Sequence, residues 1–193
     1  MYILTTGTDG YIVLWKAPHR VFSMDRENAS QTESANDIKL GKWYWRSRTH
    51  QSSIKSTITI RTSPESLLTI TGGDDNALGL THTEFSSDGG GILSSTTRIP
   101  KAHASAITAL AEIPSPDPQR IQFASSSNDQ RLKLWSVVLR DKRALEVKKE
   151  VSIETAVADV SGMIVSGESD MRVVVSGVGM EAWKVTGPMT VVR

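Results

Sequence analysis

One spacing of polar and aromatic residues recurs along this chain of 193 residues and restricts what the chain can fold into. In the most complete copy a serine follows a histidine by 22 residues, an aspartate follows the serine by four, and a tryptophan follows the aspartate by six. These residues are His103, Ser125, Asp129 and Trp135. Two short apolar runs flank the polar turn at 127–130, a pattern that predicts a β-hairpin.

The spacing of four and then six residues occurs in two further places. In one copy a threonine follows the histidine by 21 residues, and a second threonine stands at the tryptophan position: His50, Thr71, Asp75 and Thr81. In the copy nearest the N-terminus the histidine is missing: Thr5, Asp9 and Trp15. Three copies of one offset pattern indicate an architecture built from repeats.

This pattern resembles that of the WD40 family, whose repeat folds into a four-stranded blade of a β-propeller. The resemblance implies a chain of side-chain hydrogen bonds in which Trp135 donates to Ser125, Ser125 to His103, and His103 to Asp129. Such a network pairs buried polar atoms and holds neighbouring strands in one register. The copies depart from the family pattern in part, since Thr81 replaces a tryptophan.

The resemblance predicts an all-β fold of about three and a half propeller blades, and because a ring needs at least about four, we expect the C-terminal part of a larger propeller. In the last blade we expect only Trp183 of the polar chain to remain. The segment 22–38 has no apolar period and is predicted to be a flexible loop. The predicted units are a blade part at 2–16, blades at 43–81 and 93–135, and a terminal blade at 145–185.

The composition of the chain excludes several classes of site but points to no particular function. The chain has 22 basic and 21 acidic residues, so no overall field favours a nucleic acid or an acidic partner. It has no cysteine, which excludes disulfides and thiolate metal sites. No apolar run approaches the ~20 residues of a membrane span, and no apolar signal-peptide stretch follows the first residues. We therefore expect a cytoplasmic protein without a membrane partner.

No residue pattern indicates a catalytic, cofactor or metal site. His50 and His103 occupy equivalent positions of the repeat, which favours a structural role over metal ligation or general-base catalysis. Asp74 and Asp75 are typical of a turn. The segment 88–91 is rich in glycine but lacks the lysine and hydroxyl residue of a phosphate-binding loop. We therefore expect a protein that is not an enzyme and that binds no cofactor.

The basic and aromatic segment 42–48 is the candidate surface for RNA or a partner. Its alternation predicts that Trp43 and Trp45 share one face of an outer strand. The opposite face would carry Lys42, Tyr44, Arg46 and Arg48. Cations could contact phosphates, and an exposed ring could stack on a base. The alternative interpretation, which we favour, is an ordinary outer strand with packed tryptophans and a solvated cationic face.

Two stretches of the sequence resemble one particular family of WD40 proteins. AHASAITAL (102–110) with SSSNDQRLKLW (125–135) resembles the last full blade of the WD repeat-containing protein six family, and VVVSGVGMEAWKV (173–185) resembles its terminal hairpin. This resemblance implies a non-catalytic subunit that binds a separate tRNA 2′-O-methyltransferase and helps present the wobble nucleotide for methylation. Binding of the methyl donor, S-adenosylmethionine, would belong to that partner. The alternative is a general protein-interaction scaffold, such as a substrate receptor or trafficking adaptor, without an RNA role.

Overall fold

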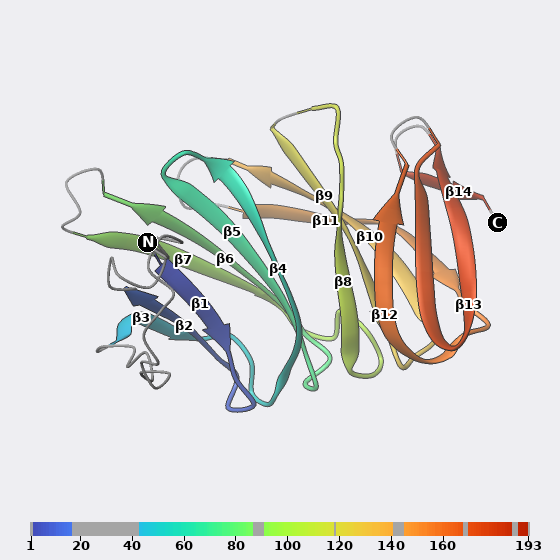
Figure 1. The fold of residues 1–193 in the computed structure, drawn as a ribbon, viewed down its shortest axis with the longest axis horizontal. Coiled ribbons are helices and arrows are strands. Elements are labelled where there is room, and N and C mark those ends of the chain that lie inside the picture. The colour runs from blue at the N-terminus through green and yellow to red at the C-terminus, as the bar shows by residue number, and fades with distance from the viewer. Residues whose placement is uncertain are drawn as a thin grey trace, which may run out of the picture.

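Every regular element in the described part of the chain is a β-strand, which confirms the predicted all-β class. The computed structural model describes residues 2–16, 43–86, 91–117, 119–140, 145–167, 170–186 and 189–192. Its strands form four antiparallel sheets that follow one another from the N-terminal to the C-terminal end of the molecule (Figure 1). We call these sheets blades 1 to 4. The loop predicted at 22–38 lies outside the described residues.

The strands of each blade pair in chain order, as in a meander that needs only short turns. Blade 1 contains β1 (Tyr2–Thr6), β2 (Tyr11–Lys16) and β3 (Trp43–Arg48). Blade 2 contains β4 (Ile54–Ser63), β5 (Ser66–Gly73), β6 (Leu78–Phe85) and β7 (Ile92–Ile99). Blade 3 contains β8 (Ile107–Ile113), β9 (Arg120–Ser127), β10 (Arg131–Leu139) and β11 (Leu145–Glu154). Blade 4 contains β12 (Ala158–Ser166), β13 (Arg172–Thr186) and β14 (Thr190–Val192).

The long strand β13 contains a reversal of the chain. The Val185 amide donates to the Met171 carbonyl over 2.8 Å, so the two ends of β13 lie side by side. Gly179 has a φ of 112°, a backbone conformation that glycine adopts without the strain of a side chain. The chain therefore forms a hairpin within residues 173–185, where the resemblance predicts one.

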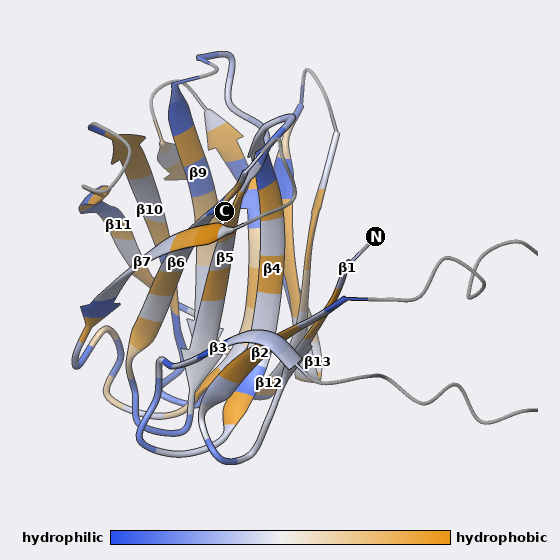
Figure 2. Cartoon of the chain, turned by 90° about the vertical axis from the view of Figure 1, so that its left-hand side faces the viewer, coloured by the Kyte–Doolittle hydropathy of each residue, from blue (hydrophilic) through white to orange (hydrophobic). Residues whose placement is uncertain are grey.

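Blade 3 is covered on both of its faces. Successive residues of a strand point to opposite sides of the sheet. On β9, Phe123 belongs to a core cluster shared with blade 2, and Ala124 belongs to a second cluster shared with blade 4. Trp135 and Leu134 of β10 are divided between the two clusters in the same way. The apolar bands along the strands in Figure 2 reflect this packing of blade against blade.

The two ends of the row of blades are less covered. Among the described residues four of the six exposed large hydrophobic side chains lie on blade 4: Ile164, Val178, Met180 and Val192. On blade 1 the Trp43 side chain is exposed. These are the faces on which further blades would pack in a larger propeller, which stays a prediction.

We expect core and end-face residues to differ sharply in their contribution to stability. Leu134 is 0% exposed between blades 3 and 4, and Leu134→Ala should lower the free energy of unfolding by about 2–5 kcal/mol. Ile164 is 61% exposed, and Ile164→Ala should change it by no more than about 0.5 kcal/mol. Urea denaturation of the two variants tests this. Equal losses would show that the outer face of blade 4 is covered in solution.

Candidate functional site

The most complete polar network lies at the junction of blades 2 and 3. The Trp135 indole donates to Ser125 Oγ over 2.8 Å, and Ser125 Oγ lies 2.8 Å from His103 Nε2. His103 Nδ1 lies 3.1 and 3.0 Å from the two carboxylate oxygens of Asp129. The carboxylate only accepts, so Nδ1 carries the proton and Nε2 accepts from the serine hydroxyl. One neutral tautomer of His103 thus satisfies the whole chain of bonds.

Asp129 also closes the turn between β9 and β10 and binds the preceding loop. Its carboxylate accepts from the Ala104 amide over 2.8 Å and from the Arg131 amide over 3.0 Å. Burial acts to raise the pKa of Asp129, but these amides and His103 outweigh burial and lower it. Burial lowers the pKa of His103 to about 4, against the opposing effect of Asp129. The histidine is therefore neutral and the aspartate ionised at neutral pH.

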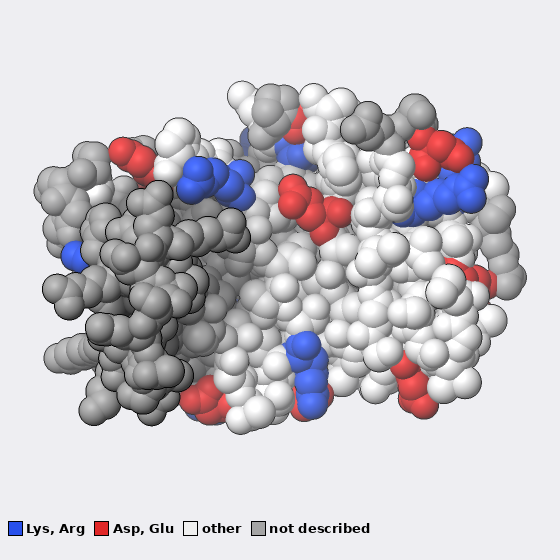
Figure 3. Space-filling view, in the orientation of Figure 1, with Lys and Arg blue, Asp and Glu red and all other residues white. Residues whose placement is uncertain are grey.

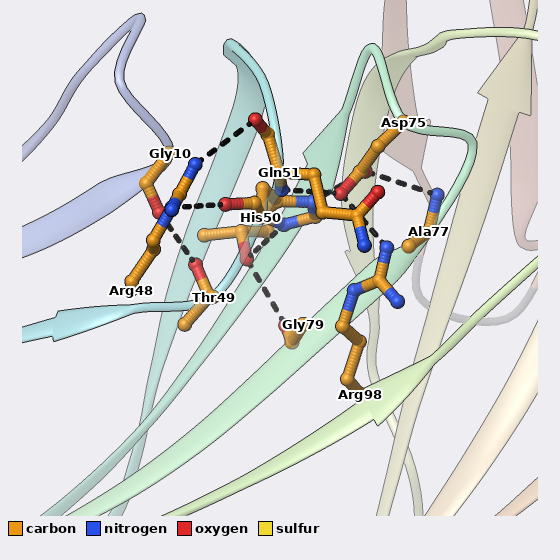
Figure 4. A network of polar contacts seen from close by, with 10 residues as sticks. Gly10, Arg48, Thr49, His50, Gln51, Asp75, Ala77, Gly79 and Arg98 are labelled. Atoms are coloured by element: carbon orange, nitrogen blue, oxygen red, sulfur yellow. Dashed lines mark hydrogen bonds and ion pairs between the residues drawn. The ribbon is translucent and has the colours of Figure 1, made fainter.

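Blade 2 contains a related network without a tryptophan (Figure 4). His50 joins Thr71 Oγ1 through Nε2 and Asp75 Oδ1 through Nδ1, both over 2.8 Å. Thr81 does not take the place of the missing indole, because its hydroxyl bonds to Thr96 over 3.1 Å. An arginine that the repeat pattern does not contain, Arg98 of β7, binds Asp75 over 2.9 Å instead.

Asp75 holds the loop that connects blades 1 and 2. Its Oδ2 atom accepts from the Gln51 amide over 2.7 Å and from Arg98. Burial acts to raise the pKa of Asp75, but the hydrogen bonds from His50, Gln51 and Arg98 prevail and lower it from 3.8 to about 2. Asp75 thus contacts the loop before its blade in the way that Asp129 does.

Blade 1 retains part of the pattern. The Trp15 indole donates to Thr5 Oγ1 over 2.8 Å, and Asp9 accepts from the Tyr11 amide over 3.2 Å. The turn of Asp9 continues into Gly10, whose carbonyl accepts from the amides of the Thr49 loop. Gly10 has a φ of 80°, and an added Cβ would lie 2.3 Å from the His50 carbonyl oxygen, so only glycine fits this contact.

Blade 4 has a carboxylate that the sequence analysis missed. Glu181 accepts from Thr155 Oγ1 over 2.8 Å and from the Ala156 amide over 2.9 Å. The expectation that only Trp183 of the polar chain remains in this blade is therefore wrong. The signal was the spacing, since Thr155 precedes Glu181 by 26 residues, as His103 precedes Asp129. Glu181 and Thr155 therefore occupy the positions that Asp129 and His103 have in blade 3.

The predicted basic surface on β3 is only partly free for a ligand. Arg48 donates to the carbonyls of His50 and Gln51, each over 3.2 Å, and so supports the loop before blade 2. The Tyr44 ring lies 5.6 Å from the Tyr2 ring. Lys42 lies outside the described residues.

Arg46 is the cation of this surface that lies against aromatic rings. Its guanidinium is 5.2 Å from the Tyr11 ring and 5.1 Å from the Trp43 ring. The prediction that Trp43 and Trp45 share a face is wrong. A register shift at Trp15 pairs Trp43 with Trp15 but Trp45 with Leu14, and these two neighbours on β2 point to opposite faces.

The described residues do not bring together a metal-binding group. Within these ranges no three His, Asp or Glu side chains cluster as a metal site would require. The same ranges contain no helix long and apolar enough to cross a membrane. Charges of both signs are scattered over the face in Figure 3, as the balanced composition predicts. Among the described residues, the polar networks of the blades therefore form hydrogen bonds that join blades to loops.

Removing the blade 4 carboxylate should destabilise the protein. In Glu181→Ala the Thr155 hydroxyl and the Ala156 amide lose their acceptor, at a cost of about 1–3 kcal/mol in the free energy of unfolding. The matched control is Glu154→Ala, which removes an exposed ion pair with Arg131 worth at most about 1 kcal/mol. Urea denaturation compares them. An equal loss in both variants would contradict the role of Glu181.

The free energy of unfolding should decrease as the pH is lowered through a window set by His103. Its pKa is about 4 in the folded chain and 6.5 when unperturbed, so below pH 6.5 the unfolded chain binds more protons. This contribution is complete above pH 6.5 and is lost as the pH falls toward 4. In His103→Gln the urea midpoint should fall less steeply over that window. Parallel curves for the native chain and the variant would contradict the assignment.

The comparisons with known proteins agree with this geometry. A family model described as WD domain, G-beta repeat matches residues 91–136. A chain in a crystal structure of the mitotic checkpoint complex superposes with a TM-score of 0.55 at 15% sequence identity. The superposition covers 96% of this chain and 46% of that one, so this chain spans about half its length. No curated protein matches the sequence, and the narrower resemblance to the WD repeat-containing protein six family stays a prediction. Residues 91–136 thus match the model of a WD40 repeat, and the chain has the fold of β-propeller blades.

Proposed function

We propose that this chain is a non-catalytic scaffold that binds a protein partner. The observation that carries the proposal is the carboxylate bound to the loop before each of blades 2, 3 and 4: Asp75, Asp129 and Glu181. Each bond fixes a loop that faces solvent, and a surface that is already ordered loses little conformational entropy on binding. The similar chain in the mitotic checkpoint complex belongs to a protein assembly, which supports a protein partner.

The test is saturable binding to a purified partner, found by cross-linking and mass spectrometry in cells that express the tagged chain. We expect stoichiometric binding that weakens in Asp129→Asn, because the single amide oxygen cannot accept both from the Ala104 amide, which bonds Oδ2, and from the Arg131 amide, which bonds Oδ1. The matched control is Asp170→Asn on blade 4, whose carboxylate forms ion pairs with the exposed side chains of Arg172 and Lys184. Failure of the native chain to bind any partner at stoichiometric amounts would refute the proposal.

A second candidate is the subunit of a tRNA wobble 2′-O-methylation complex, with a separate methyltransferase as partner. The observation that favours it is the stack of Arg46 with Tyr11 and Trp43, because Trp43 is 41% exposed. A guanidinium beside an exposed ring can bind a phosphate while the ring stacks on a base. Correct positioning of the wobble ribose would then assist the methyltransferase.

Two measurements test this RNA role. Arg46→Ala should weaken tRNA binding by the chain with its methyltransferase and reduce the slope of log K against log salt by about 1. Arg172→Ala, which removes a charge from blade 4, should leave both unchanged. Disruption of the gene should abolish 2′-O-methylation at the wobble nucleotide alone, as mapped by mass spectrometry. Unchanged methylation would refute the RNA role and leave the protein scaffold.

A further inference from the structure

The outer strand of blade 2, β7, differs from the other outer strands in its charge. Within the described residues the far edge of each outer strand has no partner strand. β3 has two arginines, β11 has five charged residues, and β14 is only three residues long. β7 has no charged residue from Ile92 to Thr97. Charge and short length both oppose the addition of a further strand, and β7 has neither protection over these residues.

β7 also differs in the regularity of its pairing. The pairing of β3 with β2 shifts at Trp15, and the pairing of β11 with β10 shifts at Trp135. Bulges of this kind bend and twist an edge so that another strand fits poorly. β7 pairs with β6 in one unbroken register along its whole length. Blade 2 has Thr81 in place of the tryptophan, and its outer strand pairs without a register shift.

A cavity of about 570 Å³ opens where β7 begins. Its walls include the aromatic and aliphatic side chains of Phe85, Ile92 and Leu93, the last of which is 40% exposed. Two carboxylates, Glu65 and Glu84, also line it, and within the described residues neither forms an ion pair. The cavity therefore offers an apolar wall and negative charge at one end of an open edge.

We propose that β7 binds an extended segment of a partner protein as an added antiparallel strand. Every strand pair between the labelled strands is antiparallel, and this pairing is slightly more stable than the parallel one. The C-terminal end of the added segment then lies beside Ile92, where a lysine or arginine meets Glu65 and Glu84. Backbone bonds provide affinity and the cation fixes the direction. The inference rests on the proposed protein-binding role and names its surface.

Fluorescence anisotropy with the full chain tests the inference on defined probes. The first is an eight-residue peptide that alternates valine and threonine and has two lysines at its C-terminal end. The second has the same composition with both lysines at the N-terminal end. The third repeats the first with alternate amides methylated on the edge that would face β7. We expect the first to bind at least about tenfold more tightly than the third, because two lost backbone bonds suffice for that factor.

Variants of the chain assign the site. Glu65→Gln with Glu84→Gln should remove the preference for the first peptide over the second and reduce its salt dependence. The matched control is Glu146→Gln with Glu154→Gln on β11. Thr96→Lys places a charge on the exposed middle of β7 and should weaken the binding of both the first and the second peptide. Amide hydrogen exchange should slow along 92–97 when the first peptide binds, and circular dichroism checks that each variant is folded.

Equal binding of the first and third peptides, or unchanged exchange along 92–97, would overturn the inference. The scaffold proposal can fail separately. If the partner found by cross-linking still binds Thr96→Lys and no peptide binds β7, the inference is wrong and the scaffold role stands. If the peptide binds β7 but the native chain has no stoichiometric partner, the scaffold role is wrong and the edge site stands.

Discussion

The structure depends on one recurring hydrogen bond, from the backbone amide of a connecting loop to the carboxylate in the next blade's turn. Asp75, Asp129 and Glu181 each accept such a bond, from Gln51, Ala104 and Ala156 in turn. The loop comes from the outer strand of one blade and leads to the inner strand of the next. The bond therefore holds both the turn within a blade and the junction between blades. An unpaired carboxylate at these sites would destabilise both.

Much of this arrangement could be predicted from residue spacing. A serine and an aspartate four residues apart mark a strand and the turn that follows it, and the histidine 22 residues before the serine marks the preceding loop. The geometry of His103 matches that reading, with bonds of 2.8 Å to Ser125 and of 3.0 Å to Asp129. The spacing is informative because a buried histidine needs partners at both ring nitrogens, so three positions must coincide.

The remainder could not be predicted because other residue types perform the same role. Glu181 accepts a bond from a loop amide as Asp75 and Asp129 do, although its side chain is one methylene longer. Strict alternation failed at Trp43 because a bulge, which leaves no signature in a two-residue period, shifts the register of β3. Arg98 follows no repeat spacing, and only the fold brings it to Asp75.

The two-sided covering of blade 3 has a consequence for folding. Blade 3 contributes to both apolar clusters, whereas blade 4 contributes to one. In a row of units that contact only their neighbours, the free energy of opening is lowest at the ends and highest in the middle. Among the described blades, opening of blade 3 therefore uncovers apolar side chains of both clusters. An intermediate in which blades 3 and 4 have separated would expose the second cluster, and such a species would be prone to aggregate.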